Sequence, residues 1–361
     1  MGPAIIVDKS VYQGFSPKLV NRLNSLFYPI FTTVLFRECA GNLGKYAEID
    51  ECITGFMKTA KAFQSGQGRF MIDVHRLLDL EETGEGFPLD GRPIVIPEST
   101  MQTGNGVSVL IEEEKERSQI RGWIKGTFRE GERIFWGESR NKNQSYPLEE
   151  EFILLKDQLC IFKNMDDASR YVEKTLSNKN ELLGIIDVIL DRCKSSPRNL
   201  LHRLRDVCTE SSLGSLPYHR HVLHVIILFY ILLASGLIGT RSTNLIDLEY
   251  FFYLPFCKVF TSGDKFHRTM FKALRFSNCL YLDRDILAGD LKKIEHYFSK
   301  FSQSDTKLYR ETYGSYPPPI ANSQICLAWE KSMGPRKIMK QKIHGPDMKA
   351  IREDYMAHFN K

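Results

Sequence analysis

Short apolar runs alternate with helical periodicity at the beginning of the chain. Residues 4–7 (AIIV) are apolar and are followed by Asp8, which predicts a buried strand with a carboxylate at its C-terminal end. Residues 18–26 have the apolar spacing of a helix, residues 28–31 form a second apolar run, and residues 34–43 return to helical spacing. A strand, helix, strand, helix order is typical of a parallel α/β sheet.

The same alternation returns near residue 245. Residues 245–256 are expected to form a helix, and residues 257–261 (CKVFT) a short buried strand with Asp264 just beyond its end. A further helix is expected over residues 265–276 and a further strand over residues 278–282. This second block therefore completes the predicted α/β unit.

The stretch between the two blocks is irregular at first and then helical. Residues 94–96 and 107–111 are candidates for strands or a hairpin, and residues 149–208 have apolar side chains at helical spacing. We therefore predict one α/β domain that is interrupted by a large insertion. The predicted parts are the N-terminal part of the domain (1–48), a mostly helical insertion (49–239), the C-terminal part of the domain (240–290) and a C-terminal extension (291–361).

One apolar segment raises the question of a membrane. Residues 222–238 contain His224 as their only ionisable residue, but they fall short of the about 20 apolar residues that a spanning helix needs. We favour a helix that is buried on all sides within a large domain, with a membrane span as the alternative. No stable membrane insertion is therefore expected.

Composition indicates a globular protein. Of the 361 residues, 42% are hydrophobic and 26% are charged, which excludes a disordered, collagen-like or coiled-coil chain. The eight cysteines include no CxxC pair and have no zinc-finger spacing, so we expect free thiols in a reducing cytoplasm. The net charge of +5 is compatible with a nucleic-acid partner without requiring one.

Four acidic residues stand where α/β sheets bind ligands. Asp8 and Asp264 follow predicted strands, and Glu38 and Asp247 lie on the helices expected beside them. Carboxylates gathered in one pocket repel one another unless a cation lies between them, and hard cations such as Mg²⁺ or Mn²⁺ prefer oxygen ligands. Two such ions about 3.5–4 Å apart promote the attack of water on a phosphodiester. The four acids are therefore candidate metal ligands and catalytic groups.

The sequence around these acids resembles the PIN-like nuclease superfamily. The segments IIVDKSVYQ, FRECAGNL and FTSGDKFHR are similar to the family's first strand with its Asp, to its helix with a Glu, and to its strand, Thr/Ser, any residue, Asp element. The resemblance implies a three-layer fold with a short parallel sheet. It also implies a quartet of catalytic residues that hold Mg²⁺ or Mn²⁺: Asp8, Glu38, Asp247 and Asp264.

The position of the third acid, Asp247, departs from the family's pattern. The family usually has a much shorter separation between its second and third acids, so residues 49–239 would be an insertion within the nuclease fold. Glu249 is the nearest rival to Asp247, but residues two positions apart do not share a helix face.

The resemblance further implies a metal-dependent endonuclease, with RNA expected as the substrate ahead of DNA. Ser10 and Ser262 would be polar contacts near the acids, and Lys265, His267 and Arg268 would offer cations to substrate phosphate. Either the basic residues between 331 and 342 also track a nucleic-acid backbone, or they form a solvated tail.

Two other functions stay open from the sequence. One is a catalytically inactive PIN-like module that binds nucleic acid or a protein, and the other is a structure-selective DNA nuclease. Oligomerisation or a protein inhibitor is also compatible with the sequence. The motifs of zinc proteases, serine hydrolases and P-loop enzymes are absent from it. The group His219, His221 and His224 is a weak metal candidate, because no carboxylate is close to it in sequence.

Overall fold

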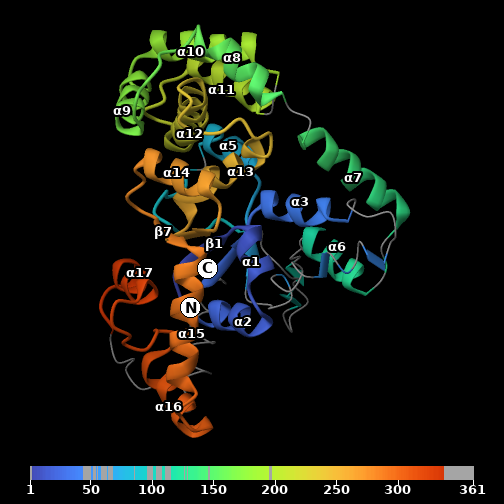
Figure 1. Cartoon of the computed structure of the whole chain (residues 1–361), viewed down its shortest axis with the longest axis vertical. Helices are drawn as coiled ribbons and strands as arrows, with labels where there is room; N and C mark the ends of the chain where they lie inside the picture. Colours follow the sequence, from blue (N-terminus) through green and yellow to red (C-terminus); the bar gives the residue numbers. More distant parts are fainter. Residues whose placement is uncertain are drawn as a thin grey trace.

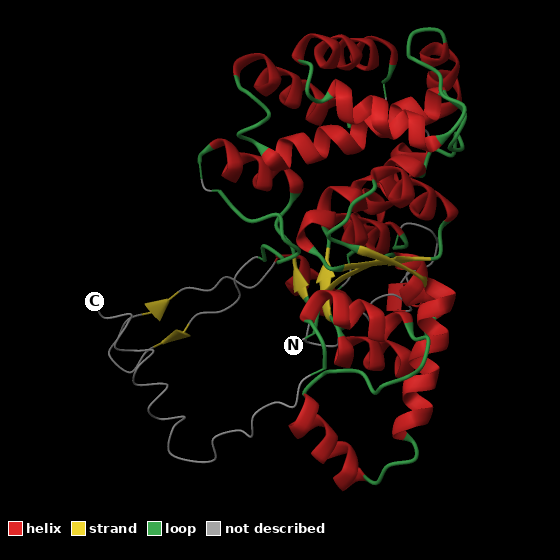
Figure 2. Ribbon diagram, turned by 90° about the vertical axis from the view of Figure 1, so that its left-hand side faces the viewer, coloured by secondary structure: helices red, strands yellow, loops and turns green. Residues whose placement is uncertain are grey.

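The computed structural model describes most of the chain. Its residues are 2–43, 68–84, 86–95, 115–125, 129–144, 147–194 and 197–336, with separate positions at 50–51, 54, 56–57, 63, 101–102, 108–109 and 127. A central sheet carries helices on both sides, and a layer of helices lies at one end (Figures 1 and 2). The predictions for residues 96, 107, 110–111 and 337–342 fall outside the described residues.

The sheet has five parallel strands in the order β3, β2, β1, β6, β7. Their bounds are β1 (Ala4–Val7), β2 (Tyr28–Phe31), β3 (Arg69–Phe70), β6 (Val259–Ser262) and β7 (Leu280–Asp283). In the central strand β1, Ile5 lies opposite Pro29 of β2 and opposite Val259 of β6. All four residues of β1 are buried, as a strand between two helical layers requires. The predicted α/β class is confirmed.

Polar caps fix where the helices next to the sheet begin. These helices are α1 (Lys9–Gly14), α2 (Pro17–Leu26), α3 (Thr33–Gly41), α14 (Lys265–Leu274) and α15 (Arg284–Phe298). Ser16 accepts a hydrogen bond from the N–H of Leu19, and Thr32 accepts one from the N–H of Leu35. Because such caps satisfy N–H groups that the helix itself cannot, they place each helix start directly after a strand or a turn.

A helical layer covers the end of the sheet near α14 (Figure 1). It contains α8 (Leu148–Lys156), α9 (Met165–Thr175), α10 (Lys179–Arg192), α11 (Arg198–Glu210) and α12 (Pro217–Ala234). In the described part of the chain, α12 alone is long and apolar enough to cross a membrane, and 83% of its apolar window is buried. Since α8, α9, α11 and α14 all pack against α12, its apolar faces are covered by protein.

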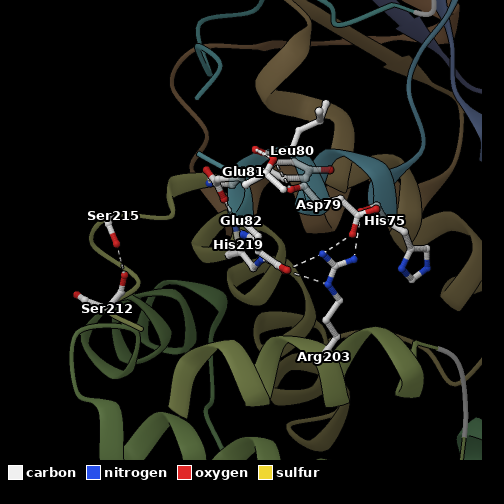
Figure 3. A network of polar contacts seen from close by, with 11 residues as sticks. His75, Asp79, Leu80, Glu81, Glu82, Arg203, Ser212, Ser215 and His219 are labelled. Carbon is white, nitrogen blue, oxygen red and sulfur yellow. Dashed lines mark hydrogen bonds and ion pairs between the residues drawn. The ribbon is translucent and has the colours of Figure 1, made fainter. Parts of the chain in front are cut away.

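A buried carboxylate holds the beginning of α12 (Figure 3). Glu81, at the end of α5 (Val74–Glu82), accepts hydrogen bonds from the N–H groups of Tyr218 and His219 at 2.8 and 2.9 Å. The ring of His219 also lies between two carboxylates, 2.7 Å from Glu81 and 2.8 Å from Glu82. This histidine is therefore a structural partner of α5 rather than a member of the histidine group considered for a metal.

The remaining elements surround this frame. They are α6 (Lys115–Ile124), α7 (Glu130–Gln144), α13 (Asn244–Leu248), the 3₁₀ helix η1 (Glu249–Phe256), α16 (Gln303–Tyr313), α17 (Gln324–Met333) and the strand pair β4 (Met101–Gln102) and β5 (Ser108–Val109). Trp123 of α6 stacks on Phe36 of α3, with ring centroids 5.8 Å apart. The cysteines within the described residues are free, as expected.

Several boundaries differ from the sequence prediction. The helix expected over 245–256 divides into α13 and η1, because Pro255 cannot donate the hydrogen bond that a regular α-helix needs. The strand expected over 257–261 covers Val259–Ser262 instead. Val95, expected in a strand, forms an isolated bridge with Met71. Strand β3 lies inside the stretch predicted as an insertion, yet it pairs with β2.

Candidate active site

The acidic residues gather at the carboxyl edge of the sheet. Asp8 directly follows β1 and is 5% exposed, and its backbone N–H donates to the carbonyl of Thr261 in β6. Asp264 follows β6 and caps α14, accepting a hydrogen bond from the N–H of Phe266 at 2.7 Å. Because β1 and β6 are parallel neighbours, both carboxylates come to the same edge, as the sequence predicts.

Two serines hold the carboxylate of Asp8. The hydroxyls of Ser10 and Ser262 donate to Oδ2 of Asp8 at 2.5 and 2.8 Å. The hydroxyl of Ser262 also accepts from the N–H of Asp264 at 2.9 Å. The two serines predicted near the acids therefore lie there, and Ser262 connects Asp8 directly to the start of α14.

His267 occupies a different position from the one expected. It has no exposed surface, and burial lowers the pKa of its imidazole. Its Nδ1 lies 2.8 Å from the hydroxyl of Ser262, and its Nε2 lies 3.1 Å from the backbone carbonyl of Asp247. The expected contact of His267 with substrate phosphate is therefore wrong. The ring instead positions Ser262 and ties α14 to α13.

The other two predicted cations reach the surface. Lys265 and Arg268 are both exposed at the start of α14. The guanidinium of Arg268 pairs with the carboxylate of Asp283 at the end of β7. Both residues are within one helical turn of Asp264 in sequence.

Glu38 reaches the acidic group from α3. The hydroxyl of Tyr250 donates to its Oε2 at 2.5 Å, while Lys9 donates to its backbone carbonyl at 2.9 Å. Burial, followed by the nearby charge of Asp8, raises the pKa of Glu38 to about 7.

Asp247 reaches the same group from α13 and is 8% exposed. Burial raises the pKa of Asp247 to about 8, with further contributions from the charges of Glu38, Asp8 and Asp264. Its rival Glu249 forms an ion pair with Arg37 of α3 instead. The interactions among these charges therefore favour Asp247 as the third acid.

One arginine connects two of the acids. Nη2 of Arg241 donates to Oδ2 of Asp247 at 2.9 Å and to Oδ2 of Asp264 at 2.8 Å. Although partial burial acts in the opposite direction, the hydrogen bond from Arg241 and the N–H of Phe266 lower the pKa of Asp264. A single positive charge thus compensates two carboxylates on one side of the group, while Lys9 and Arg37 are the nearby cations that lower the pKa of Glu38.

The carboxylate oxygens of the four acids are the type of ligand that a hard cation prefers, but the side chains are not arranged as a metal site. Within the described residues, no group of three or more His, Cys, Asp or Glu side chains has the spacing of a metal site. All four acids nevertheless offer oxygen ligands, and burial, followed by the charges of the neighbouring acids, raises the pKa values of Glu38 and Asp247.

Three residues of the site were not selected from the sequence. Tyr250 and Arg241 lie in no motif, and Lys9 occurs only as part of the segment IIVDKSVYQ. No local signal pairs Tyr250 with Glu38, because the two residues are 212 positions apart in the chain. Arg241 reaches the acids from a turn, where sequence periodicity gives no information.

Comparison of the chain with protein-family models, with curated proteins and with solved structures finds no match.

Proposed function

We propose that this protein is a metal-dependent nuclease of the PIN-like type, which hydrolyses phosphodiester bonds within RNA. The observation that supports the proposal is the convergence of Asp8, Glu38, Asp247 and Asp264 at one sheet edge. They come from distant parts of the chain, and burial together with mutual repulsion raises the pKa of two of them. Buried acids that destabilise one another in this way are typical of functional sites.

In this proposal the four acids hold Mg²⁺ or Mn²⁺. The metal would supply the Lewis acidity and positive charge that phosphodiester hydrolysis requires. The resemblance to PIN-like nucleases implies products with 5′-phosphate and 3′-hydroxyl ends. Ser10 and Ser262 keep the Asp8 carboxylate in one orientation through their hydrogen bonds. His267 is a positioning residue, because it acts on Asp8 through Ser262.

Exposed cations beside the acids support a polyanionic substrate. Lys265 and Arg268 stand at the start of α14, next to Asp264, and both are exposed, although Arg268 also pairs with Asp283. Cations in this position contact backbone phosphates and orient the strand without reading its sequence. The net charge of +5 acts in the same direction.

A cleavage assay tests the proposal. Labelled single-stranded RNA, single-stranded DNA and a flapped DNA duplex are each incubated with the full chain in Mg²⁺, Mn²⁺ or EDTA. The Asp8→Asn and Asp264→Asn variants should lose at least a hundredfold in rate, whereas Asp191→Asn, an exposed aspartate of α10, should keep full activity. Cleavage of the flapped duplex alone would identify a structure-selective DNA nuclease instead.

The bridge made by Arg241 supports one alternative function. With Arg241 on Asp247 and Asp264, the site is already partly neutralised and could hold nucleic acid without cutting it. This module would bind RNA equally in EDTA and in Mn²⁺, and Asp8→Asn would leave the affinity unchanged. No cleavage of any offered polymer, together with metal-independent binding, would favour it over the nuclease.

A further inference from the structure

A further arginine lies at the carboxyl edge of the sheet and pairs with none of the four acids. Arg284 is the first residue of α15 and directly follows β7, which is the parallel neighbour of β6. Because the carboxyl ends of parallel strands meet at one edge, β7 brings Arg284 to the same edge as Asp8 and Asp264. Arg284 is outside the segments that resemble PIN-like nucleases.

Two glycines leave the space in which the side chain of Arg284 lies. A Cβ on Gly263, between β6 and Asp264, would lie 3.1 Å from Nε and 3.2 Å from Cζ of Arg284, which is closer than a side chain normally approaches. A Cβ on Gly14, at the end of α1, would lie 3.6 Å from its Cδ, which is an ordinary contact distance. The guanidinium therefore lies against the backbone at Gly263, in a position that depends on glycine there.

The loop that contacts Arg284 is the one that holds Asp8. The N–H of Gly263 donates to the hydroxyl of Ser10 at 3.4 Å, and Ser10 in turn donates to the carboxylate of Asp8. Arg284 therefore contacts the loop beside the acids and not the acids themselves. This position suits a contact with a substrate phosphate next to the cleaved one, because the four acids surround the place of the metal and the cleaved phosphate.

Most of the hydrogen-bonding capacity of Arg284 is unused. Its Nε donates to Oδ1 of Asp285 at 3.0 Å, and neither Nη1 nor Nη2 has a partner among the residues that the structure describes. The side chain of Asp285 is 79% exposed, so water screens this pair and it holds the arginine only weakly. The side chain of Arg284 is itself 36% exposed, and neither of its Nη atoms is buried. The two Nη groups are therefore accessible, and paired N–H donors of this kind bind phosphate oxygens.

We propose that Arg284 binds the substrate phosphate next to the one that is cleaved, and that it thereby sets the position of the strand over the acidic edge. The proposal rests on the proposed nuclease function, because it leaves the cleaved phosphate to the four acids. A contact with a backbone phosphate reads no base, so Arg284 selects the position of the strand and not its sequence.

Binding of the full chain to a short labelled single-stranded RNA tests the contact separately from cleavage. The titrations contain Ca²⁺, which takes oxygen ligands as Mg²⁺ does, and the RNA is checked to be intact afterwards. Arg284→Ala should weaken binding roughly tenfold. The slope of log affinity against log salt should also fall by about 0.7, which corresponds to the loss of one phosphate contact on a single strand. A purely structural role of Arg284 would leave this slope unchanged.

Three variants serve as comparisons in the same titrations. Arg284→Lys keeps the charge but loses the planar fork, so its affinity should lie between those of Arg284→Ala and the unchanged protein. Gly263→Ala keeps the arginine but displaces its guanidinium, so it should also weaken binding, whereas Gly14→Ala meets only ordinary contacts and should bind normally. Arg170→Ala removes an exposed arginine that pairs within α9, and it should change neither the affinity nor the salt slope.

A cleavage map in Mn²⁺ locates the phosphate that Arg284 contacts. Each RNA carries one neutral methylphosphonate in place of a phosphate. In the unchanged protein, this group should suppress cleavage at its own position and, roughly tenfold, at the adjacent phosphodiester on one side. In Arg284→Ala the effect on the adjacent bond should disappear, because the two changes remove the same contact. With unsubstituted RNA, the variant should raise KM about tenfold and change kcat less.

The two measurements separate this proposal from the nuclease itself. Normal affinity, salt slope and cleavage map in Arg284→Ala would overturn the role of Arg284 while the nuclease proposal stands, and so would a failure of the unchanged protein to bind RNA that it nevertheless cleaves. Binding that depends on Arg284, without cleavage in Mn²⁺ or Mg²⁺, would overturn the nuclease and support the phosphate contact within the binding module. Absence of both binding and cleavage would overturn both proposals.

Discussion

The hydroxyl of Tyr250 donates a hydrogen bond of 2.5 Å to the carboxylate of Glu38, which joins η1 to α3 at the acidic edge. Tyr250 is fully buried and Glu38 has a raised pKa, so this bond stabilises the charged form of a carboxylate that burial and Asp8 disfavour. The contact therefore couples the packing of two helical segments to the charge of the site.

Replacing Tyr250 by Phe should affect both stability and metal binding. Without the hydroxyl, the pKa of Glu38 rises further, so we expect weaker Mn²⁺ binding at pH 7 and a loss of about 1–2 kcal/mol in unfolding free energy. Urea denaturation and Mn²⁺ titration measure the two effects. Tyr253→Phe is the matched control, because it removes a buried hydroxyl that contacts Thr33 rather than an acid of the site. If both variants bind Mn²⁺ alike, Tyr250 has only a structural role.

Stability without divalent cations should fall as the pH rises from about 4 to about 8. In the folded chain the pKa values of Glu38 and Asp247 are raised to about 7 and about 8, so the folded state binds more protons than the unfolded state in this window. By linkage, the unfolding free energy then decreases with increasing pH until both groups are ionised. Below the ordinary carboxyl pKa, both states are protonated and the effect is absent.

Asp247→Asn should remove most of this pH dependence. The neutral amide has no charge to bury, so we expect the variant to melt about 2–5 °C higher than the unchanged protein at pH 8 and at nearly the same temperature at pH 4. Thermal melts in EDTA between pH 4 and pH 8 measure this difference in melting temperature, and Asp191→Asn is the control at an exposed aspartate. A lower melting temperature at pH 8 would show that the ion pair with Arg241 outweighs the burial of the charge.

Arg241→Ala should strengthen the binding of Mn²⁺ to the acidic edge. The guanidinium compensates Asp247 and Asp264, so a metal has to compete with it. Removing it should tighten Mn²⁺ binding roughly tenfold, or about 1.4 kcal/mol, and should lower stability in EDTA. Calorimetric titration compares it with Arg268→Ala, which removes a nearby arginine that pairs with Asp283 instead. Weaker Mn²⁺ binding would mean that Arg241 organises the acids rather than competing for them.

Glu81→Ala should destabilise the chain without touching the acidic edge. The variant loses the acceptor for two N–H groups at the start of α12 and leaves the buried ring of His219 without one of its partners. We expect a loss of about 3 kcal/mol in urea denaturation, whereas Glu82→Ala, at a more exposed partner of the same ring, should cost about 1 kcal/mol. Cleavage per folded molecule should be unchanged in both variants.

Local patterns were sufficient for the elements next to the site. The run AIIV and the capping residues Ser16 and Thr32 define β1 and the helices around β2, so their bounds agree closely with the sequence prediction. The placement of Asp8 and Asp264 at one edge follows from strand polarity alone. Strand β3 could not be predicted, because two residues, Arg69 and Phe70, carry no periodicity and become a strand only by pairing with β2.

Tertiary contacts determine the rest of the site. Beside Asp264, His267 was expected to be a surface cation, but it lies three and seven positions before Met270 and Leu274, and these three residues share the buried face of α14. The bridge made by Arg241 depends on the turn before α13. A cavity at the amino ends of the strands is lined by residues near 22–28, by residue 69 and by residues 298–316. These residues are too far apart in the chain for a local sequence pattern to combine them.

The pairing of β1 with β6 also determines when the centre of the sheet can form during translation. The central strand of the sheet emerges from the ribosome first, but one of its two neighbours, Val259–Ser262, emerges only after the whole helical layer. Closing so long a loop is slow and entropically costly, while helices α8 to α12 can form from local contacts in the meantime. Asp8 thus gains Ser262 as a partner, with His267 behind Ser262, only when the segment around Asp264 has been translated. A nascent chain that is still shorter than this lacks β6 and Asp264, so the acidic edge is completed only after the helical layer has been translated.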